Sequence, residues 1–212
     1  MSQLFIHGLG QDSSSWDKTL SMLTYPNKAA CPNLATLVGG NEYTYENIYK
    51  AFSVYACSYN EPISICGLSL GAVIALNFAV DNPERVLSLI LIAPQYKIPK
   101  TLLQLQNIIF RLMPNSAFKK MGMSKNAIIR LTKSMMNLDF SERLKDIACP
   151  TLVLCGEKDK VNRTSCETVA RLIPNAEIKM IENAGHEVNI DAPEKLAVAI
   201  NSFFDNVSHS TP

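Results

Sequence analysis

Three polar side chains of this 212-residue chain have the types and the order of a nucleophile, an acid and a base. The nucleophile candidate is Ser69, in the sequence Gly67-Leu68-Ser69-Leu70-Gly71. This G-x-S-x-G pattern lies between the apolar run ISIC and the helical stretch AVIALNFAV, the strand-turn-helix context that presents a reactive serine. Gly67 and Gly71 leave room for a strained turn, and the dipole of the following helix favours negative charge at Ser69. The pattern predicts a nucleophile elbow; its alternative is a serine that caps the helix.

A serine hydroxyl needs a base to take its proton and an acid to orient that base. Asp159 follows the apolar run TLVLC, and His186 follows the run EIKMI. The chain order Ser69, Asp159, His186 is the one that doubly wound α/β hydrolytic enzymes use. These residues are therefore the predicted catalytic triad. Glu157 and Asp191 stay open as alternative orienting acids, with Asp191 more simply explained by a role at the start of the last helix.

Two backbone N-H groups are expected to stabilise an oxyanion beside Ser69. The sequence His7-Gly8-Leu9-Gly10 follows the first apolar run, and a turn there would bring the N-H of Leu9 close to the N-H of Leu70. The alternative is an ordinary glycine turn. For His7 we expect a role in ordering that loop, and for His209 a solvated position in the tail.

Short apolar runs separated by helical patterns must position these groups. Such an alternation predicts an α/β fold with an open, mostly parallel six-stranded sheet and helices on both faces. Active groups of such sheets lie in loops at the carboxyl ends of strands. The expected strands are 4–6, 63–66, 86–93, 151–155, 177–181 and a weaker one at 34–38. The expected helices are 15–23, 45–59, 70–80, 164–172 and 193–204, with residues 208–212 as a frayed tail.

Residues 94–148 interrupt this alternation with helical patterns at 101–112, 116–121 and 124–136. The stretch is longer than a crossover between strands requires. We therefore predict an inserted helical cap at 94–148, carried by an α/β core formed by residues 1–93 and 149–212.

Composition narrows the function classes. Twenty basic and nineteen acidic residues give a net charge of +1, which argues against whole-surface binding of nucleic acid. We expect no integral membrane segment and no signal peptide, and hence a cytoplasmic protein. The cysteines have no metal-site spacing and are expected to be reduced, small buried residues. They are residues 31, 57, 66, 149, 155 and 166.

The near-neutral charge conceals an asymmetry. The predicted cap carries ten Lys or Arg and only three acidic residues, a net charge of +7, which the rest of the chain offsets. Such a patch can attract an anionic substrate or an acyl carrier, and equally it can be the solvated face of amphipathic helices. Five of the eight methionines also lie there and suit either an adaptable acyl pocket or simple packing.

At these motifs the chain resembles the α/β-hydrolase fold superfamily, in the branch of small capped serine esterases, lipases and C-C hydrolases. The resemblance rests on HGLGQDSSSW, GLSLGA, LCGEKDKVN and NAGHEVNIDAPEKL. It implies an eight-stranded sheet, of which the first two strands are missing here. Ser69 argues against dehalogenases and epoxide hydrolases, which carry a carboxylate nucleophile, and Ala72 departs from the Ser-x-Gly-Gly-Arg elbow of the menaquinone-pathway lyase.

The function expected from the sequence is a carboxylesterase-like serine hydrolase. It would cleave an ester or thioester of a small to medium acyl substrate through an acyl-enzyme, with no metal or organic cofactor. One alternative is a lyase or C-C hydrolase that uses the triad for proton abstraction and binds a carboxylate-rich substrate through cap arginines such as Arg111 or Arg130. Another is a hydrolase-like ligand receptor or regulatory partner. Oligomeric state cannot be read from the sequence.

Overall fold

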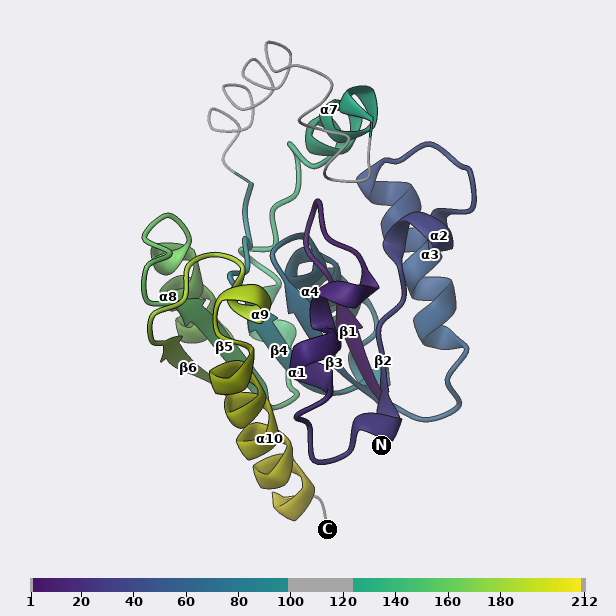
Figure 1. Ribbon diagram of the computed structural model, residues 1–212. Helices are drawn as coiled ribbons and strands as arrows, with labels where there is room; N and C mark the ends of the chain where they lie inside the picture. Colours follow the sequence, from purple (N-terminus) through teal and green to yellow (C-terminus); the bar gives the residue numbers. More distant parts are fainter. Residues whose placement is uncertain (1, 99–123, 211–212) are drawn as a thin grey trace.

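Six strands form one open, parallel sheet in the computed structural model, which describes residues 2–98 and 124–210 (Figure 1). Their order across the sheet is β2-β1-β3-β4-β5-β6, and every neighbouring pair is parallel. The strands are β1 (Gln3–Ile6), β2 (Ala29–Ala30), β3 (Ile63–Leu68), β4 (Val86–Ile92), β5 (Thr151–Gly156) and β6 (Ala176–Ile181). The predicted fold class is confirmed.

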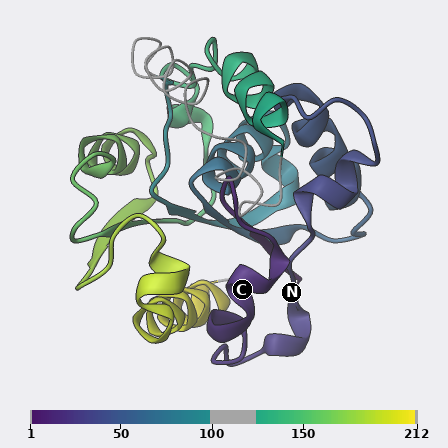
Figure 2. The same cartoon turned by 45° about the horizontal axis from the view of Figure 1, so that its top comes forward.

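Helices cover both faces of this sheet (Figure 2). On one face lie α2, α3, α4, α7 and α8; on the other lie η1, α1, α9 and α10. The helices are α1 (Asp17–Leu20), α2 (Leu34–Val38), α3 (Tyr45–Cys57), α4 (Leu70–Asp81), α7 (Lys125–Ser134), α8 (Arg163–Leu172), α9 (Val188–Asp191) and α10 (Pro193–Ser210). Short 3-10 turns are η1 (Ser13–Trp16), η2 (Pro26–Lys28), η3 (Pro83–Arg85) and η4 (Leu144–Asp146).

Alternating side chains of the strands fill two separate cores. In β1, Leu4 and Ile6 pack on the α3 and α4 side, while Phe5 packs on the α10 side against Trp16 with ring centroids 5.2 Å apart. Neighbouring side chains of a strand point to opposite faces, so a strand buried on both faces must be apolar at every position. This explains the uninterrupted apolar runs of the central strands.

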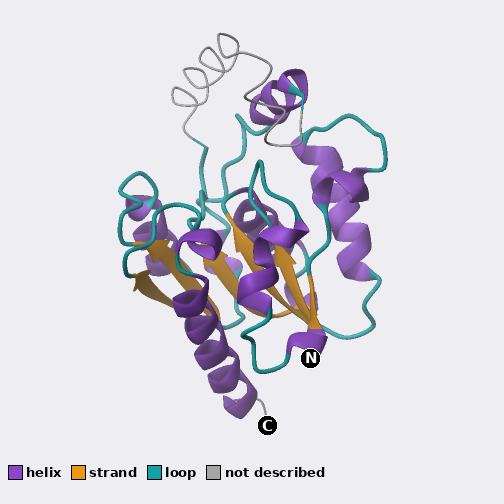
Figure 3. Cartoon of the chain, viewed as in Figure 1, coloured by secondary structure: helices purple, strands orange, loops and turns teal. Residues whose placement is uncertain are grey.

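The helix α4 lies against the middle of the sheet and is buried almost all round. Ten of its twelve residues are buried, which matches the apolar sequence AVIALNFAV that lacks a polar face. A helix of this kind has a fixed place in the core. Only Ser69 separates the end of β3 from the start of α4, so the turn between them is fixed from both sides (Figure 3).

The expected strand at residues 34–38 is wrong, because this segment is the helix α2. The side chain of Asn33 accepts hydrogen bonds from the N-H groups of Ala35 and Thr36, at 3.0 and 3.2 Å. Gly39 ends the helix with a φ of 62°. An Asn cap before the segment and a glycine after it are helix signals that outweigh the short apolar run of five residues. The second strand is instead the two-residue β2.

The other expected elements agree with the structure apart from their ends. The helix expected at 15–23 is divided into η1 and α1, and the one at 124–136 is the shorter α7. The frayed tail is wrong for residues 208–210, which continue α10. The helices expected at 101–112 and 116–121 lie outside the described residues, so the cap at 94–148 stays a prediction.

The cysteines follow the expectation only in part. Cys66, Cys155 and Cys166 are buried, whereas Cys31 and Cys149 are half-buried and Cys57 is exposed. Burial raises the pKa of the Cys31 thiol to about 12. Cys57 lies at the end of α3, whose buried side is formed by other residues.

None of the described helices is long and apolar enough to cross a membrane.

Two arginines of segment 124–148 bind acidic residues of the predicted α/β core. Arg130 pairs with Glu42, and Arg143 pairs with Asp81 at 2.8 Å. Both guanidinium groups are about half exposed, so each pair adds roughly 0–1 kcal/mol to stability. Part of the positive charge of the segment therefore faces the core's own carboxylates rather than a partner.

The capping role of Asn33 can be tested by mutation. Replacing it by alanine (Asn33→Ala) removes the acceptor for two N-H groups and should lower the free energy of unfolding by about 1 kcal/mol. Urea unfolding followed by circular dichroism measures this change. Asn33→Asp keeps a capping oxygen and should retain most of the stability, whereas equal losses in both variants would contradict the cap.

Candidate active site

Ser69 lies at the sharp turn between β3 and α4. Its φ of 54° and ψ of −111° are values that side chains rarely adopt. The strain is held by the surrounding structure, because the Ser69 N-H donates to the Ile92 carbonyl at 2.9 Å. The Ser69 hydroxyl makes no capping bond to α4, which excludes the interpretation as a helix-capping serine.

The two elbow glycines allow close backbone contact. A Cβ atom on Gly67 would lie 2.3 Å from the carbonyl oxygen of Gly71. A Cβ atom on Gly71 would lie 2.2 Å from the carbonyl oxygen of Ile6. Gly67 thus lets the chain turn from strand into helix, as predicted. Gly71 has a further role, because it lets α4 rest on the neighbouring strand β1.

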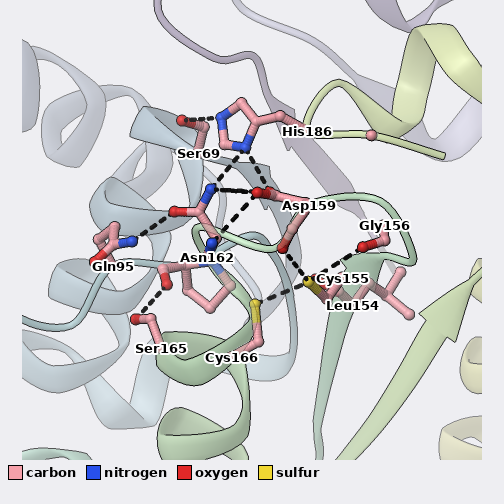
Figure 4. A network of polar contacts seen from close by, with 12 residues as sticks. Ser69, Gln95, Leu154, Cys155, Gly156, Asp159, Asn162, Ser165, Cys166 and His186 are labelled. Atoms are coloured by element: carbon pink, nitrogen blue, oxygen red, sulfur yellow. Dashed lines mark hydrogen bonds and ion pairs between the residues drawn. The ribbon is translucent and has the colours of Figure 1, made fainter.

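Ser69, His186 and Asp159 form a continuous chain of hydrogen bonds (Figure 4). The Ser69 Oγ and His186 Nε2 atoms are 3.0 Å apart, and His186 Nδ1 and Asp159 Oδ2 are 2.8 Å apart. The Asp159 side chain is 4% exposed and that of His186 is 42% exposed. The structure therefore brings together the three predicted residues, with a buried carboxylate behind an imidazole that solvent can reach.

The loops that carry Asp159 and His186 are in direct backbone contact with each other. Asp159 follows β5, and His186 lies between β6 and α9. The Lys158 N-H donates to the Ala184 carbonyl at 2.9 Å. A Cβ atom on Gly156 would lie only 2.0 Å from the Gly185 carbonyl oxygen, so this contact requires glycine at position 156. The distance between Asp159 and His186 is thus set by backbone contacts.

The turn that carries Leu9, one of the two predicted oxyanion donors, begins beside the serine. Gly8 is next to Ser69, since a Cβ atom on Gly8 would lie 3.6 Å from Ser69 Cβ. Leu9 follows Gly8 in this turn, and Leu70 is the first residue of α4. Side chains of Gln11 and the buried Asn189 connect the turn to α9, with Gly8 N-H donating to Gln11 Oε1 at 3.3 Å. The role of Leu9 and Leu70 stays a prediction.

The alternative acids have other partners. Glu157 is exposed and accepts a hydrogen bond from the Asn183 N-H at 2.9 Å. Asp191 accepts one from the Gly185 N-H at 2.7 Å, so it shapes the histidine loop rather than the start of α10 as expected. Among the described residues, Asp159 is the acid that contacts His186.

The other two histidines lie in different elements from His186: His7 follows β1, and His209 lies near the end of α10. His7 is buried, its Nδ1 lies 2.9 Å from the Gly8 carbonyl oxygen, and its Nε2 accepts from the Leu34 N-H at 3.1 Å. Through these contacts His7 connects the Gly8 turn to the start of α2, in agreement with the predicted loop-ordering role. His209 lies in α10 and not in an irregular tail.

Two polar residues next to the triad were not identified from the sequence. Asn162 contacts both Asp159 and His186, and Gln95 donates to Asn162 (Figure 4). Asn162 lies three residues after Asp159, a spacing that could have drawn attention to it. No sequence signal links Gln95 to the site, because it lies in a different loop.

A cavity of about 620 Å³ lies beside this network. It is lined by the segments 95–98 and 136–139 and by residues of α8 such as Ser165 and Thr168. Ser69 and His186 are not among its described lining residues.

Within residues 2–98 and 124–210, no group of three His, Cys, Asp or Glu side chains could hold a metal ion.

The sequence matches the model of the alpha/beta hydrolase family over residues 3–199. The chain therefore belongs to the α/β hydrolase family, as its motifs indicated. Two relatives show how far the similarity extends. The chain is 26% identical to monoacylglycerol lipase ABHD6 of Mus musculus over 185 residues, which is 74% of this chain and 52% of the lipase. It is 24% identical to ABHD6 of Rattus norvegicus, covering 85% of this chain and 56% of that protein. It thus spans about half the length of these lipases.

Solved structures share the fold over nearly the whole chain. MenH from S. aureus has a TM-score of 0.80 at 17% identity and is covered to 94%, with 98% of this chain aligned. A thermophilic esterase from Thermogutta terrifontis has a TM-score of 0.76 at 20% identity. The alignment covers 98% of this chain and 90% of the esterase. At these identities the likeness shows the fold alone.

The buried His7 should make stability depend on pH. Burial lowers the pKa of His7 below 6.5, so the unfolded chain binds the proton more readily than the folded protein. Stability contributed by neutral His7 is full above pH 6.5 and is lost as the pH falls through the folded-state pKa. The loss is about 1.4 kcal/mol for each tenfold difference in proton affinity between the two states.

Urea unfolding from pH 8 to pH 5 measures this dependence. In His7→Gln, which keeps polar atoms but does not titrate, the decrease between pH 7 and pH 5 should be smaller than in the wild type. Identical pH profiles of the two proteins would contradict the assignment.

Proposed function

We propose that the protein is a serine hydrolase that cleaves a carboxylic ester or thioester through an acyl-enzyme. The observation that carries this proposal is the Ser69-His186-Asp159 chain, with contacts of 3.0 and 2.8 Å on a serine that caps no helix. A strained serine whose hydroxyl makes no capping bond, facing an imidazole that a buried carboxylate orients, is arranged for nucleophilic attack.

In the first step Ser69 Oγ attacks the acyl carbonyl carbon while His186 Nε2 takes the hydroxyl proton. This requires the tautomer in which Nδ1-H donates to Asp159, so that Nε2 presents its lone pair to the serine. The carbonyl oxygen becomes an oxyanion beside the N-H groups of Leu9 and Leu70. Each such donor contributes about 3 kcal/mol or more to lowering the barrier.

Collapse of the tetrahedral intermediate breaks the bond to the alcohol or thiol, which takes the proton from His186. Water then attacks the acyl-Ser69 carbonyl carbon, and His186 accepts a proton from that water. Release of the carboxylic acid returns the proton to Ser69 Oγ. No step needs a metal or organic cofactor, because histidine and backbone dipoles supply the proton transfer and the charge stabilisation.

Ester chemistry is favoured by the relatives. ABHD6 of Mus musculus, to which the chain is similar, is a monoacylglycerol lipase. We place the acyl group of the substrate under the segment 94–148, the predicted cap, whose uncharged residues are rich in Leu, Ile and Met. A cap in this place would control access to Ser69.

A lyase on the same triad is the second possibility that the sequence left open. Of its two named cap arginines, Arg111 lies outside the described residues and Arg130 is paired with Glu42. This pairing leaves Arg130 engaged at the surface and favours the hydrolase. The third possibility, a ligand receptor, would retain the triad without turnover.

Hydrolysis of p-nitrophenyl esters with acyl chains of two to twelve carbons tests the proposal. We expect turnover by the wild type, and a loss by a factor of about a thousand or more in Ser69→Ala, because the nucleophile is removed. Ser58→Ala is the matched control, since Ser58 is an exposed serine at the end of α3, and it should keep wild-type rates.

Unchanged hydrolysis in Ser69→Ala would contradict the proposal. No turnover of any ester, combined with protection of segment 124–148 from hydrogen exchange on addition of an ester, would favour the receptor instead.

A further inference from the structure

Asn162 occupies a place between the acid and the histidine of the triad. It lies just before α8, and its Nδ2 atom is 2.9 Å from both carboxylate oxygens of Asp159 and 3.1 Å from His186 Nδ1. The Asn162 backbone N-H also donates to Asp159 Oδ1, at 3.3 Å. In Figure 4 the amide of Asn162 lies beside the Asp159-His186 contact.

Not all of these contacts can be hydrogen bonds at once. When His186 carries its proton on Nδ1 and donates to Asp159, Nδ1 has no lone pair left for Asn162. The amide then donates to the Asp159 carboxylate alone. Donation to both oxygens fixes the rotation of the carboxylate, with Oδ2 directed at the imidazole, and spreads its negative charge over two donors.

Gln95 fixes which way the Asn162 amide faces. Its Nε2 donates to Asn162 Oδ1, so the Nδ2 end is turned to the carboxylate. The reversed amide would direct Oδ1 at the Asp159 oxygens and lose the Gln95 bond. The loop that carries Gln95 is itself held to α8, because Ser165 Oγ donates to the Pro94 carbonyl at 2.7 Å.

We propose that Asn162 is a positioning residue of the triad, oriented by Gln95, and that this bridge couples the segment leaving β4 to the Asp159-His186 pair. The inference rests on the proposed function only for its effect on turnover. Segment 94–98 leads from the sheet into the predicted cap, so a displacement of this segment reaches the triad through Gln95 and Asn162.

The Nδ1-H proton of His186 reports this role without any substrate. Asn162→Ala removes the side-chain donors that fix the Asp159 carboxylate, so the hydrogen bond from His186 Nδ1-H to Asp159 Oδ2 weakens and its downfield proton resonance moves upfield or broadens. Among the described residues, Asp159 is the charged side chain that contacts His186. Proton NMR of ¹⁵N-histidine-labelled protein separates the signals of the three histidines, and His186→Gln assigns the one from His186. We expect this Nδ1-H resonance to be displaced from its wild-type position in Asn162→Ala.

The matched control is Asn175→Ala, which removes an exposed asparagine that donates to the Ala148 carbonyl at 2.8 Å. It should leave the His186 Nδ1-H resonance unchanged. Gln95→Ala should displace this resonance in the same direction by less, and should add nothing when Asn162 is already alanine. If Asn162→Ala does not fold, Gln95→Ala provides the test of the same bridge.

The kinetic readout completes the test. With p-nitrophenyl acetate, Asn162→Ala should lower kcat about tenfold or more with little change in KM, because acyl contacts are intact. An unchanged His186 Nδ1-H resonance in Asn162→Ala would overturn the inference. A displaced resonance in a protein that hydrolyses no ester would support the inference while overturning the proposed function.

Discussion

Backbone contact at the start of α4 is the constraint on which the site depends. Gly71 lies so close to the Ile6 carbonyl, and Gly67 so close to Gly71, that no side chain fits at either position. This contact fixes α4 on β1 and β3 and forces Ser69 into its strained conformation. The same contact brings the turn after β1, with Gly8 and Leu9, to the side of the serine. Geometry that catalysis would need is thus a consequence of helix-to-sheet packing.

The rest of the site is built from loops at the carboxyl ends of neighbouring strands. β3 carries Ser69, β5 carries Asp159 and β6 precedes His186, so the parallel order of the sheet places residues far apart in sequence at one edge. Contacts between the loops then set the distance between Asp159 and His186. Gly156 packs on Gly185, and Asp191 accepts a hydrogen bond from the Gly185 N-H. A buried carboxylate and an exposed imidazole result, which is the arrangement proposed to carry proton transfer.

The sequence was sufficient to predict those parts of the fold and of the site that have a local signal. It was insufficient for the parts that depend on tertiary contacts. The elbow, the triad order and five of the six strands follow from short motifs and apolar runs. Residues 34–38 were misassigned because a short, mostly apolar run fits a strand, while the Asn33 cap and Gly39 make them a helix. Asn162 and Gln95 were missed because their partnership joins two loops 67 residues apart, which no periodicity reveals.

The central claim is that Ser69 is a nucleophile activated by the folded site. Labelling of the native protein with a fluorophosphonate, followed by intact-mass measurement and peptide mapping, tests it most directly. We expect one adduct per chain, located on Ser69, and no adduct after the protein has been unfolded, because an isolated serine hydroxyl is unreactive. A native protein that remains unlabelled, or that carries the adduct on another serine, would contradict the account.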